Sequence, residues 1–183
     1  MATRAPRIET PRLILREWTA ADREPFSRLN ADARVMAHFP SVLTTEESHA
    51  MADRIEANIE RRGFGLFAAE LRATGRFIGF IGLSVPRFEA HFTPCVEIGW
   101  RIAFDCWGQG LATESAREVL HYGFDILGLG EIVSFAATSN LRSRRVMERI
   151  GMTHDPVDDF DHPLLPDGNP LRRHVLYRTR KMP

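Results

Sequence analysis

The sequence predicts a single mixed α/β domain in which strands and helices are interleaved. Three observations predict it: runs with the two-residue alternation of strands, runs with helical periodicity between capping and glycine signals, and a glycine loop that joins a strand to a helix. The 183 residues, 44% of them hydrophobic, suffice to bury one core. No repeat or composition shift divides the chain, so residues 1–183 are taken as one domain.

The first half is predicted to contain two helices and three strands. Thr44 and Glu47 form a capping-box pattern at the start of a helix, and Gly63 follows its last turn. Aromatic and β-branched residues on both sides of Gly75 indicate a hairpin. The expected order is a strand at 13–15, helices at 20–29 and 44–61, and strands at 64–71 and 77–85.

The second half alternates strands with helices. Val96, Ile98, Trp100 and Ile102 occupy every second position, as in a strand with two different faces. The expected order is a strand at 96–102, a helix at 112–127, a strand at 132–137, a helix at 140–150 and a strand at 174–180.

An acidic, proline-rich loop without regular structure is expected at 155–170, where four prolines and five aspartates gather. Two interpretations stay open for it. Its charge suits a cationic amine, and it equally suits a solvated surface loop, which we favour.

The balance of charge excludes some classes of partner. Lysine plus arginine equal aspartate plus glutamate at 24 each, so no basic field predicts nucleic acid as a partner. No apolar run is as long as a membrane span, and residues 1–7 lack the apolar core of a secretory signal. We therefore expect a cytoplasmic protein with no membrane partner.

Cysteine and histidine spacing predicts no metal site. Cys95 and Cys106 form no C-x-x-C pair, and the histidines His38, His162 and His174 stand apart in the sequence. Both cysteines are interpreted as small buried hydrophobes.

The stretch 107–114, Trp-Gly-Gln-Gly-Leu-Ala-Thr-Glu, has the layout of an anion cradle. Its glycines permit a tight turn, and the free N–H groups at the start of the following helix attract an anion. The spacing matches neither a Walker loop, since no lysine follows Gly110, nor a dinucleotide fingerprint, since Thr113 stands at the third glycine position. An ordinary helix entry remains the alternative.

Several motifs together resemble the GCN5-related N-acetyltransferase (GNAT) family, in its RimJ/RimL-like ribosomal-protein-alanine acetyltransferase branch. Gly110 and Ala112 fit the small positions of the family's [R/Q]-x-x-G-x-G/A loop, although Trp107 stands where most members have a basic residue. The other motifs are Glu9-Thr10-Pro11-Arg12-Leu13-Ile14-Leu15-Arg16, Glu97-Ile98-Gly99-Trp100, and Asn140-Leu141-Arg142-Ser143 with Gly151-Met152.

The resemblance implies a fold and a reaction. The fold is a mixed, mostly antiparallel twisted sheet of about six or seven strands with about four helices, in which a splayed pair of strands binds acyl-CoA. The reaction is transfer of the acetyl group of acetyl-CoA to a primary amine, either a protein N-terminal α-amine or a small-molecule amine, without a metal. A non-catalytic acyl-CoA sensor or interaction module on the same fold is the alternative, and a dinucleotide oxidoreductase is a distant third.

The resemblance also assigns a donor site. The loop would take the pyrophosphate, the strand around residue 100 would run beside the pantetheine, and an asparagine would hydrogen-bond the pantetheine. The implied residues are Trp100, Arg101, Ile102, Trp107, Gly108, Gln109, Gly110, Leu111, Ala112, Thr113, Asn140 and Ser143. Core packing is the alternative role for Trp100 and Ile102, and helix capping for Asn140.

Glu97 and Ser143 are the candidate catalytic residues. By resemblance Glu97 removes a proton from the amine, and a cross-strand ion pair with an arginine is the alternative. An α-amine of pKa about 8 requires only about 1.4 kcal/mol to deprotonate at pH 7, against about 4.6 kcal/mol for a lysine. Ser143 is expected on the buried face of its helix, where it either protonates the leaving thiolate or bonds a carbonyl one turn earlier. Tyr122 and Tyr177 offer no clear alternative acid.

Arg142, Arg145 and Arg149 recur at helical spacing and form a stripe. A solvated face is the expected role, and one member is a candidate for the adenosine 3′-phosphate. Exposed strand edges also give the chain a reason to pair, so a homodimer is expected.

Overall fold

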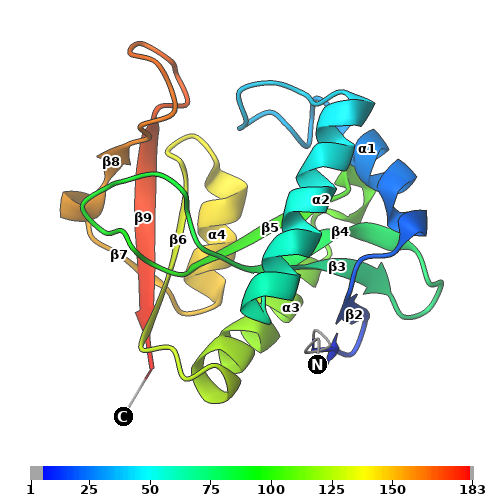
Figure 1. The fold of residues 1–183 in the computed structure, drawn as a ribbon. Coiled ribbons are helices and arrows are strands. Elements are labelled where there is room, and N and C mark those ends of the chain that lie inside the picture. The colour runs from blue at the N-terminus through cyan, green and yellow to red at the C-terminus, as the bar shows by residue number, and fades with distance from the viewer. Residues whose placement is uncertain (1–5, 182–183) are drawn as a thin grey trace.

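The computed structural model describes residues 6–181. Residues 1–5 of the opening stretch lie outside it, as do residues 182–183. The described chain forms one nine-stranded sheet flanked by four α-helices (Figure 1). The order across the sheet is β1-β2-β3-β4-β5-β6-β9-β7, and β8 also pairs with β9. Every pair is antiparallel except β5 with β6.

The six predicted strands are present, together with three two-residue strands that the sequence patterns did not resolve. The strands are β1 (Ile8–Glu9), β2 (Leu13–Arg16), β3 (Leu66–Leu71), β4 (Phe77–Ser84), β5 (Glu97–Ile102), β6 (Glu131–Ala137), β7 (Thr153–His154), β8 (Phe160–Asp161) and β9 (Arg173–Arg180).

The four predicted helices are also present, with two changes. They are α1 (Arg23–Ala31), α2 (Thr45–Arg62), α3 (Leu111–His121) and α4 (Leu141–Arg149). The helix expected at 20–29 begins as a 3₁₀ turn at Ala20–Asp22, and the one expected at 112–127 ends as a π-helical turn at Tyr122–Ile126. In that turn Gly123 packs so closely on Ile132 that a Cβ would lie 2.6 Å from its Cδ1.

The capping box of α2 is confirmed. The Thr44 hydroxyl accepts from the Glu47 N–H at 3.1 Å, and the Glu47 carboxylate accepts from the Thr44 N–H at 2.8 Å. Together these contacts satisfy two of the N–H groups that a helix start leaves unpaired.

The helices divide between the two faces of the sheet. On one face α1 packs on β4, with the rings of Phe26 and Phe80 6.0 Å apart. On the other face the π-helical turn after α3 packs on β4 and β6, since Gly123 lies against Leu83 and Ile132. In Figure 1 α2 crosses the near side of the sheet and α4 lies behind β6. These two faces are called the α1/α2 face and the α3/α4 face below.

A second apolar cluster covers β6 and β9 on the α1/α2 face. Phe92, Val133, Phe160 and Leu176 form it, with the segment between β4 and β5 crossing over both strands (Figure 1). The stretch expected to be structureless at 155–170 takes part in it through Phe160. This expectation is therefore corrected: the stretch contains a 3₁₀ turn at Pro156–Asp158 and the strand β8.

The aspartates of that stretch are largely engaged with the protein itself. Asp158 pairs with Arg178 at 2.7 Å, and Asp161 pairs with Arg173 at 3.3 Å. Asp159 lies 2.7 Å from His154. Within residues 6–181 no helix has the length and apolar character to cross a membrane.

Candidate active site

A cavity of about 490 Å³ opens where β5 and β6 diverge. Its wall brings together segments that are far apart in the sequence: the glycine loop, one side of α4 along its whole length, the end of β5 and the connection between α1 and α2. Of the residues that the sequence analysis assigned to the donor, the cavity is lined by Trp100, Arg101, Ile102, Trp107, Gly108, Gly110, Leu111, Ala112, Thr113, Asn140 and Ser143.

The divergence begins at one residue pair. Glu97 and Val133 form the only ladder pair of β5 and β6 in the described chain. Immediately beyond it the Ser134 hydroxyl donates to the Ile98 carbonyl at 2.9 Å, so a side chain replaces the next ladder bond. Backbone groups alternate in direction along a strand, and those of Trp100 therefore also face the gap with no partner strand.

The glycine loop is shaped to receive an anion. Gly108 and Gly110 both have φ in the left-handed region, at 76° and 78°, and Gly110 is the N-cap of α3. The first bond of α3 runs from the Glu114 N–H to the Gly110 carbonyl. The N–H groups of Leu111, Ala112 and Thr113 thus have no acceptor within the helix and lie at its positive end.

Gln109 differs from the rest of its loop. Its side chain donates to the Asp105 carbonyl at 3.0 Å, and it does not line the cavity. Its backbone carbonyl accepts from Arg12 Nη1 at 2.9 Å, so the residue holds the loop in place.

A clamp between the start of the chain and α3 supports this loop. One Glu114 carboxylate oxygen accepts from the Thr10 hydroxyl at 2.6 Å and from the Arg12 N–H at 2.9 Å. The other accepts from Arg12 Nε at 2.7 Å. In the sequence these residues belong to two separate motifs, at 9–16 and 107–114, and no pattern in the chain connects them. The structure shows that the two motifs are one unit.

Arginines give the cavity its charge. Arg34, Arg101, Arg142, Arg145 and Arg149 all line it, and no aspartate or glutamate does. Arg142 stacks on the Trp107 ring at 4.7 Å. The stripe on α4 thus faces the cavity instead of being only a solvated surface, and it suits a ligand with several negative charges.

Asn140 and Ser143 meet at the start of α4. The Asn140 side chain accepts from the Ser143 N–H at 3.2 Å, so its predicted role as a cap is confirmed. Ser143 is half-buried on the cavity wall, and its hydroxyl makes no hydrogen bond to any described residue. The carbonyl bond one turn earlier, which was the alternative for this serine, is absent.

Glu97 lies at the vertex of the divergence, on the α1/α2 face. Ser84 donates to its carboxylate at 3.2 Å, and no basic group of residues 6–181 lies within ion-pair distance. Burial raises the pKa of Glu97 to about 8, against a small lowering effect of Ser84. The predicted alternative, an ion pair with arginine, is absent. Glu97 itself does not line the 490 Å³ cavity.

The remaining candidates are placed away from this chemistry or are unreactive. The Tyr122 hydroxyl faces the Gly63 carbonyl and that of Tyr177 bonds Glu148, and neither tyrosine lines the cavity. Burial raises the pKa of Cys95 to about 11 and also raises the pKa of Cys106. Neither thiol is therefore a thiolate at neutral pH.

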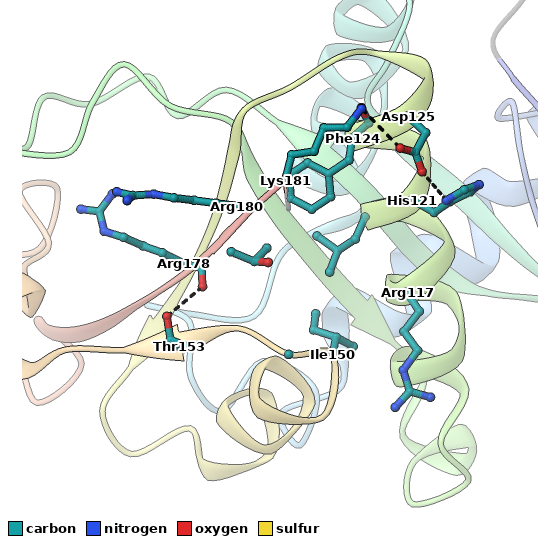
Figure 2. Close-up of a pocket in the computed structure, with 12 residues that line it drawn as sticks. Arg117, His121, Phe124, Asp125, Ile150, Thr153, Arg178, Arg180 and Lys181 are labelled. Atoms are coloured by element: carbon teal, nitrogen blue, oxygen red, sulfur yellow. Dashed lines mark hydrogen bonds and ion pairs between the residues drawn. The ribbon is translucent and has the colours of Figure 1, made fainter. Parts of the chain in front are cut away.

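A larger cavity of about 840 Å³ lies between the end of α3 and β9 (Figure 2). Its charged side chains are engaged by the protein itself: Asp125 lies 2.6 Å from His121 and 3.4 Å from Lys181, and Arg178 and Arg180 both pair with Glu131. It contains no residue of the glycine loop and no free helix N-terminus. The smaller cavity therefore has the features that suit a phosphorylated ligand, and the larger cavity lacks them. No cluster of metal-ligating side chains was found in the described part of the chain.

Comparison with known proteins agrees with this geometry. Residues 12–153 match the family model described as acetyltransferase (GNAT) domain. The chain belongs to the GNAT acetyltransferase family. It is therefore an acetyltransferase that takes its acetyl group from acetyl-CoA.

Relatives span most of the chain. It is 34% identical to FsC-acetyl coenzyme A-N(2)-transacetylase of Aspergillus fumigatus, over 81% of this chain and 66% of that protein. It is 30% identical to the uncharacterized N-acetyltransferase YnaD of Bacillus subtilis, over 88% of this chain and 89% of that protein. The crystal structure of an acetyltransferase from Agrobacterium tumefaciens superposes with a TM-score of 0.77 at 29% identity, over 96% of this chain and 95% of that one.

The donor loop gives a direct test. Acetyl-CoA at about 100 times its dissociation constant should add about 2.7 kcal/mol of stability, or about 5 to 11 °C in Tm. Gly110→Asp puts a negative charge among the free N–H groups and should abolish that shift. Differential scanning fluorimetry with acetyl-CoA, and with NADH as the non-binding comparison, measures it.

Gly128→Asp is the matched control. Gly128 also has positive φ, at 69°, and open surroundings, but it lies beyond the other end of α3. It carries the same backbone strain and charge and should retain the full shift. An undiminished shift in Gly110→Asp would remove the loop from the donor site.

Proposed function

We propose that the protein transfers the acetyl group of acetyl-CoA to a primary amine, which attacks directly within a ternary complex. The acceptor is a protein N-terminal α-amine or a small-molecule amine. The position of Glu97 carries the proposal: a carboxylate of raised pKa stands at the vertex from which the donor cavity opens. The name of the Aspergillus relative, a transacetylase acting at N(2), supports nitrogen as the accepting atom.

The raised pKa of Glu97 suits an α-amine. An α-ammonium group has a pKa of about 8, so its proton would pass to Glu97, at about 8, with almost no free-energy difference. A lysine ammonium of pKa about 10.4 would give up its proton to the same carboxylate only against a gap of more than two pKa units. This match favours an α-amine or a small amine of similar basicity.

Ser143 is proposed to protonate the thiolate of CoA as it leaves. Its hydroxyl has no hydrogen-bond partner among residues 6–181 and lies on the cavity wall beside Asn140, which is proposed to hold the pantetheine. Trp100 offers its unpaired backbone groups to the same arm, and the N–H groups after Gly110 are proposed to hold the pyrophosphate.

We further propose that the chain lies in the RimJ/RimL-like branch. A 59-residue stretch is 39% identical to the putative ribosomal N-acetyltransferase YdaF of Bacillus subtilis. Trp107 replaces the basic residue that most members have in their loop, which also fits this branch. The homodimer expected from the exposed sheet edges remains a proposal.

The first test is the pH profile of Glu97→Gln. The carboxylate acts as a base only when ionised, so wild-type kcat/KM should rise through about pH 8. The variant should lose about a hundredfold or more in kcat and also lose that rise, with little change in acetyl-CoA affinity. The acceptor's own ionisation persists in both enzymes, so the difference between the two profiles reports Glu97.

A stability measurement supplies an independent check. Because the folded pKa is raised, the native state holds a proton that the unfolded state releases, and wild-type stability falls as pH rises from about 4.5 to about 8. Glu97→Gln should lack this contribution.

Ser84→Ala tests the same carboxylate through its hydrogen-bond partner. It removes the bond that lowers the pKa of Glu97, so the pH profile of kcat/KM for Ser84→Ala should lie at higher pH than the wild-type profile. A Glu97→Gln enzyme at full speed from pH 6 to 9 would refute the role of base.

The second test concerns the proposed acid. Ser143→Ala should lower kcat about a hundredfold while leaving the acetyl-CoA dissociation constant nearly unchanged. Ser115→Ala is the control, because its hydroxyl is buried on α3 without a partner and lies outside the cavity. Equal rates for the two variants would exclude Ser143 as the acid.

The third test distinguishes direct transfer from an acyl-enzyme. Since neither thiol is activated, initial rates at varied acetyl-CoA and amine should give intersecting double-reciprocal lines. Parallel lines, or an acetylated cysteine found by mass spectrometry, would indicate a ping-pong route.

A further inference from the structure

Arg101 is a buried cation whose charge no acid compensates. The residue is 7% exposed, and it forms no salt bridge with any carboxylate of residues 6–181. Its Nη1 donates to the Asn30 side chain at 2.6 Å and lies 3.7 Å from the Met51 sulfur, while its Nε has no hydrogen-bond partner in the described part of the chain. Phe39 stacks on the guanidinium at 4.2 Å.

Burial of the Arg101 charge is unfavourable unless an opposite charge binds beside it. Burial lowers the pKa of Arg101 to about 10, because removal from water disfavours the charged form that the residue has at neutral pH. Buried charges in proteins are normally paired with an opposite charge. The neighbours hold the guanidinium in one orientation, and none of them neutralises it.

The free side of Arg101 faces the active-site cavity. Arg101 lines that cavity, and Nη2 makes no hydrogen bond to any described residue. The backbone of Arg101 pairs with Phe80 of β4, so the residue reaches the cavity through its side chain and not through the strand edge implied for pantetheine.

Arg101 also lies on the acceptor side of the sheet. It shares the α1/α2 face of β5 with Glu97, four residues earlier, and Gly99 between them has no side chain. The helix N-terminus proposed for the pyrophosphate belongs to α3, on the opposite face. The arginines of α4 are available there for the phosphates of the donor.

Resting on the proposed function, we propose that Arg101 binds an anionic group of the amine acceptor. The substrate class is then an amine that carries a carboxylate remote from the reacting nitrogen, because Arg101 lies four positions after Glu97 on β5, which places their Cα atoms about 13 Å apart. The planar guanidinium, held between Asn30 and Phe39, presents its remaining N–H groups to that carboxylate.

Paired acceptors test this directly. 6-Aminohexanoate and 6-aminohexanamide have the same length and differ in the terminal charge. Wild-type kcat/KM should favour the acid by about 30-fold or more, since loss of one partner of a buried charge pair typically has at least that effect. The preference should appear mainly in KM.

Variants of Arg101 test whether this residue causes the preference for the acid over the amide. Arg101→Met should bring the acid-to-amide ratio close to one, leave the acetyl-CoA dissociation constant within about threefold, and keep or raise Tm without ligand, because it removes an uncompensated buried charge. Arg101→Lys retains the charge and should keep part of the preference. Arg28→Met, an exposed arginine of α1 outside the cavity, should change none of these values.

A binding measurement makes the outcome independent of turnover. With CoA saturating, hexanoate should raise wild-type Tm more than hexanamide does, and Arg101→Met should lose the difference. Equal shifts, equal kcat/KM for acid and amide, or a preference that survives in Arg101→Met would overturn the proposal. Weakened acetyl-CoA binding in Arg101→Met and Arg101→Lys would assign the anion to a donor phosphate. A hexanoate shift without acetylation of any amine would instead refute the proposed function.

Discussion

The pairing of β5 with β6 is the constraint on which the site depends. Both strands are fully hydrogen-bonded on their outer edges, β5 to β4 and β6 to β9, and they share one ladder pair at Glu97 and Val133. If they paired throughout, Trp100 would have no free backbone groups and the cavity would close. The bond from Ser134 to the Ile98 carbonyl satisfies the acceptor at which pairing stops, so the opening leaves no orphaned carbonyl there.

The divergence also separates the two halves of the reaction. The α3/α4 face contributes free helix N–H groups and the arginines of α4, which suit a phosphorylated donor. The α1/α2 face contributes Glu97 and Arg101, which suit a proton and a remote anion on an acceptor. On the proposed assignment, the donor would be held mainly from the α3/α4 face and the acceptor mainly from the α1/α2 face, and the two would meet in the cavity that the glycine loop and Arg101 both line. The charged groups that suit the donor and those that suit the acceptor therefore lie on different faces of the sheet.

Local signals account for what the sequence predicted well. The cap of α2, the cap of α4 and the turns at Gly108 and Gly110 depend on residues at most a few positions apart, and each is found as expected. The two-residue strands were not predicted because β7 and β8 form only by pairing with β9, which is distant in the sequence. Likewise, the sequence identifies Arg101 only as one position of an alternating strand. Its lack of an acid partner depends on α1, α2 and the segment between them, and no spacing in the sequence encodes that.

The contact between Arg12, Thr10 and Glu114 has a consequence for how the donor site forms. It joins residues 102 and 104 positions apart, so the loop cannot be completed by its own neighbourhood in the chain. Contacts of such high sequence separation carry a larger loop-closure entropy than local contacts do. The clamp on the start of α3 is therefore present only when the first strands are docked on the rest of the sheet. On the proposed assignment, donor binding would then report on the integrity of the entire domain.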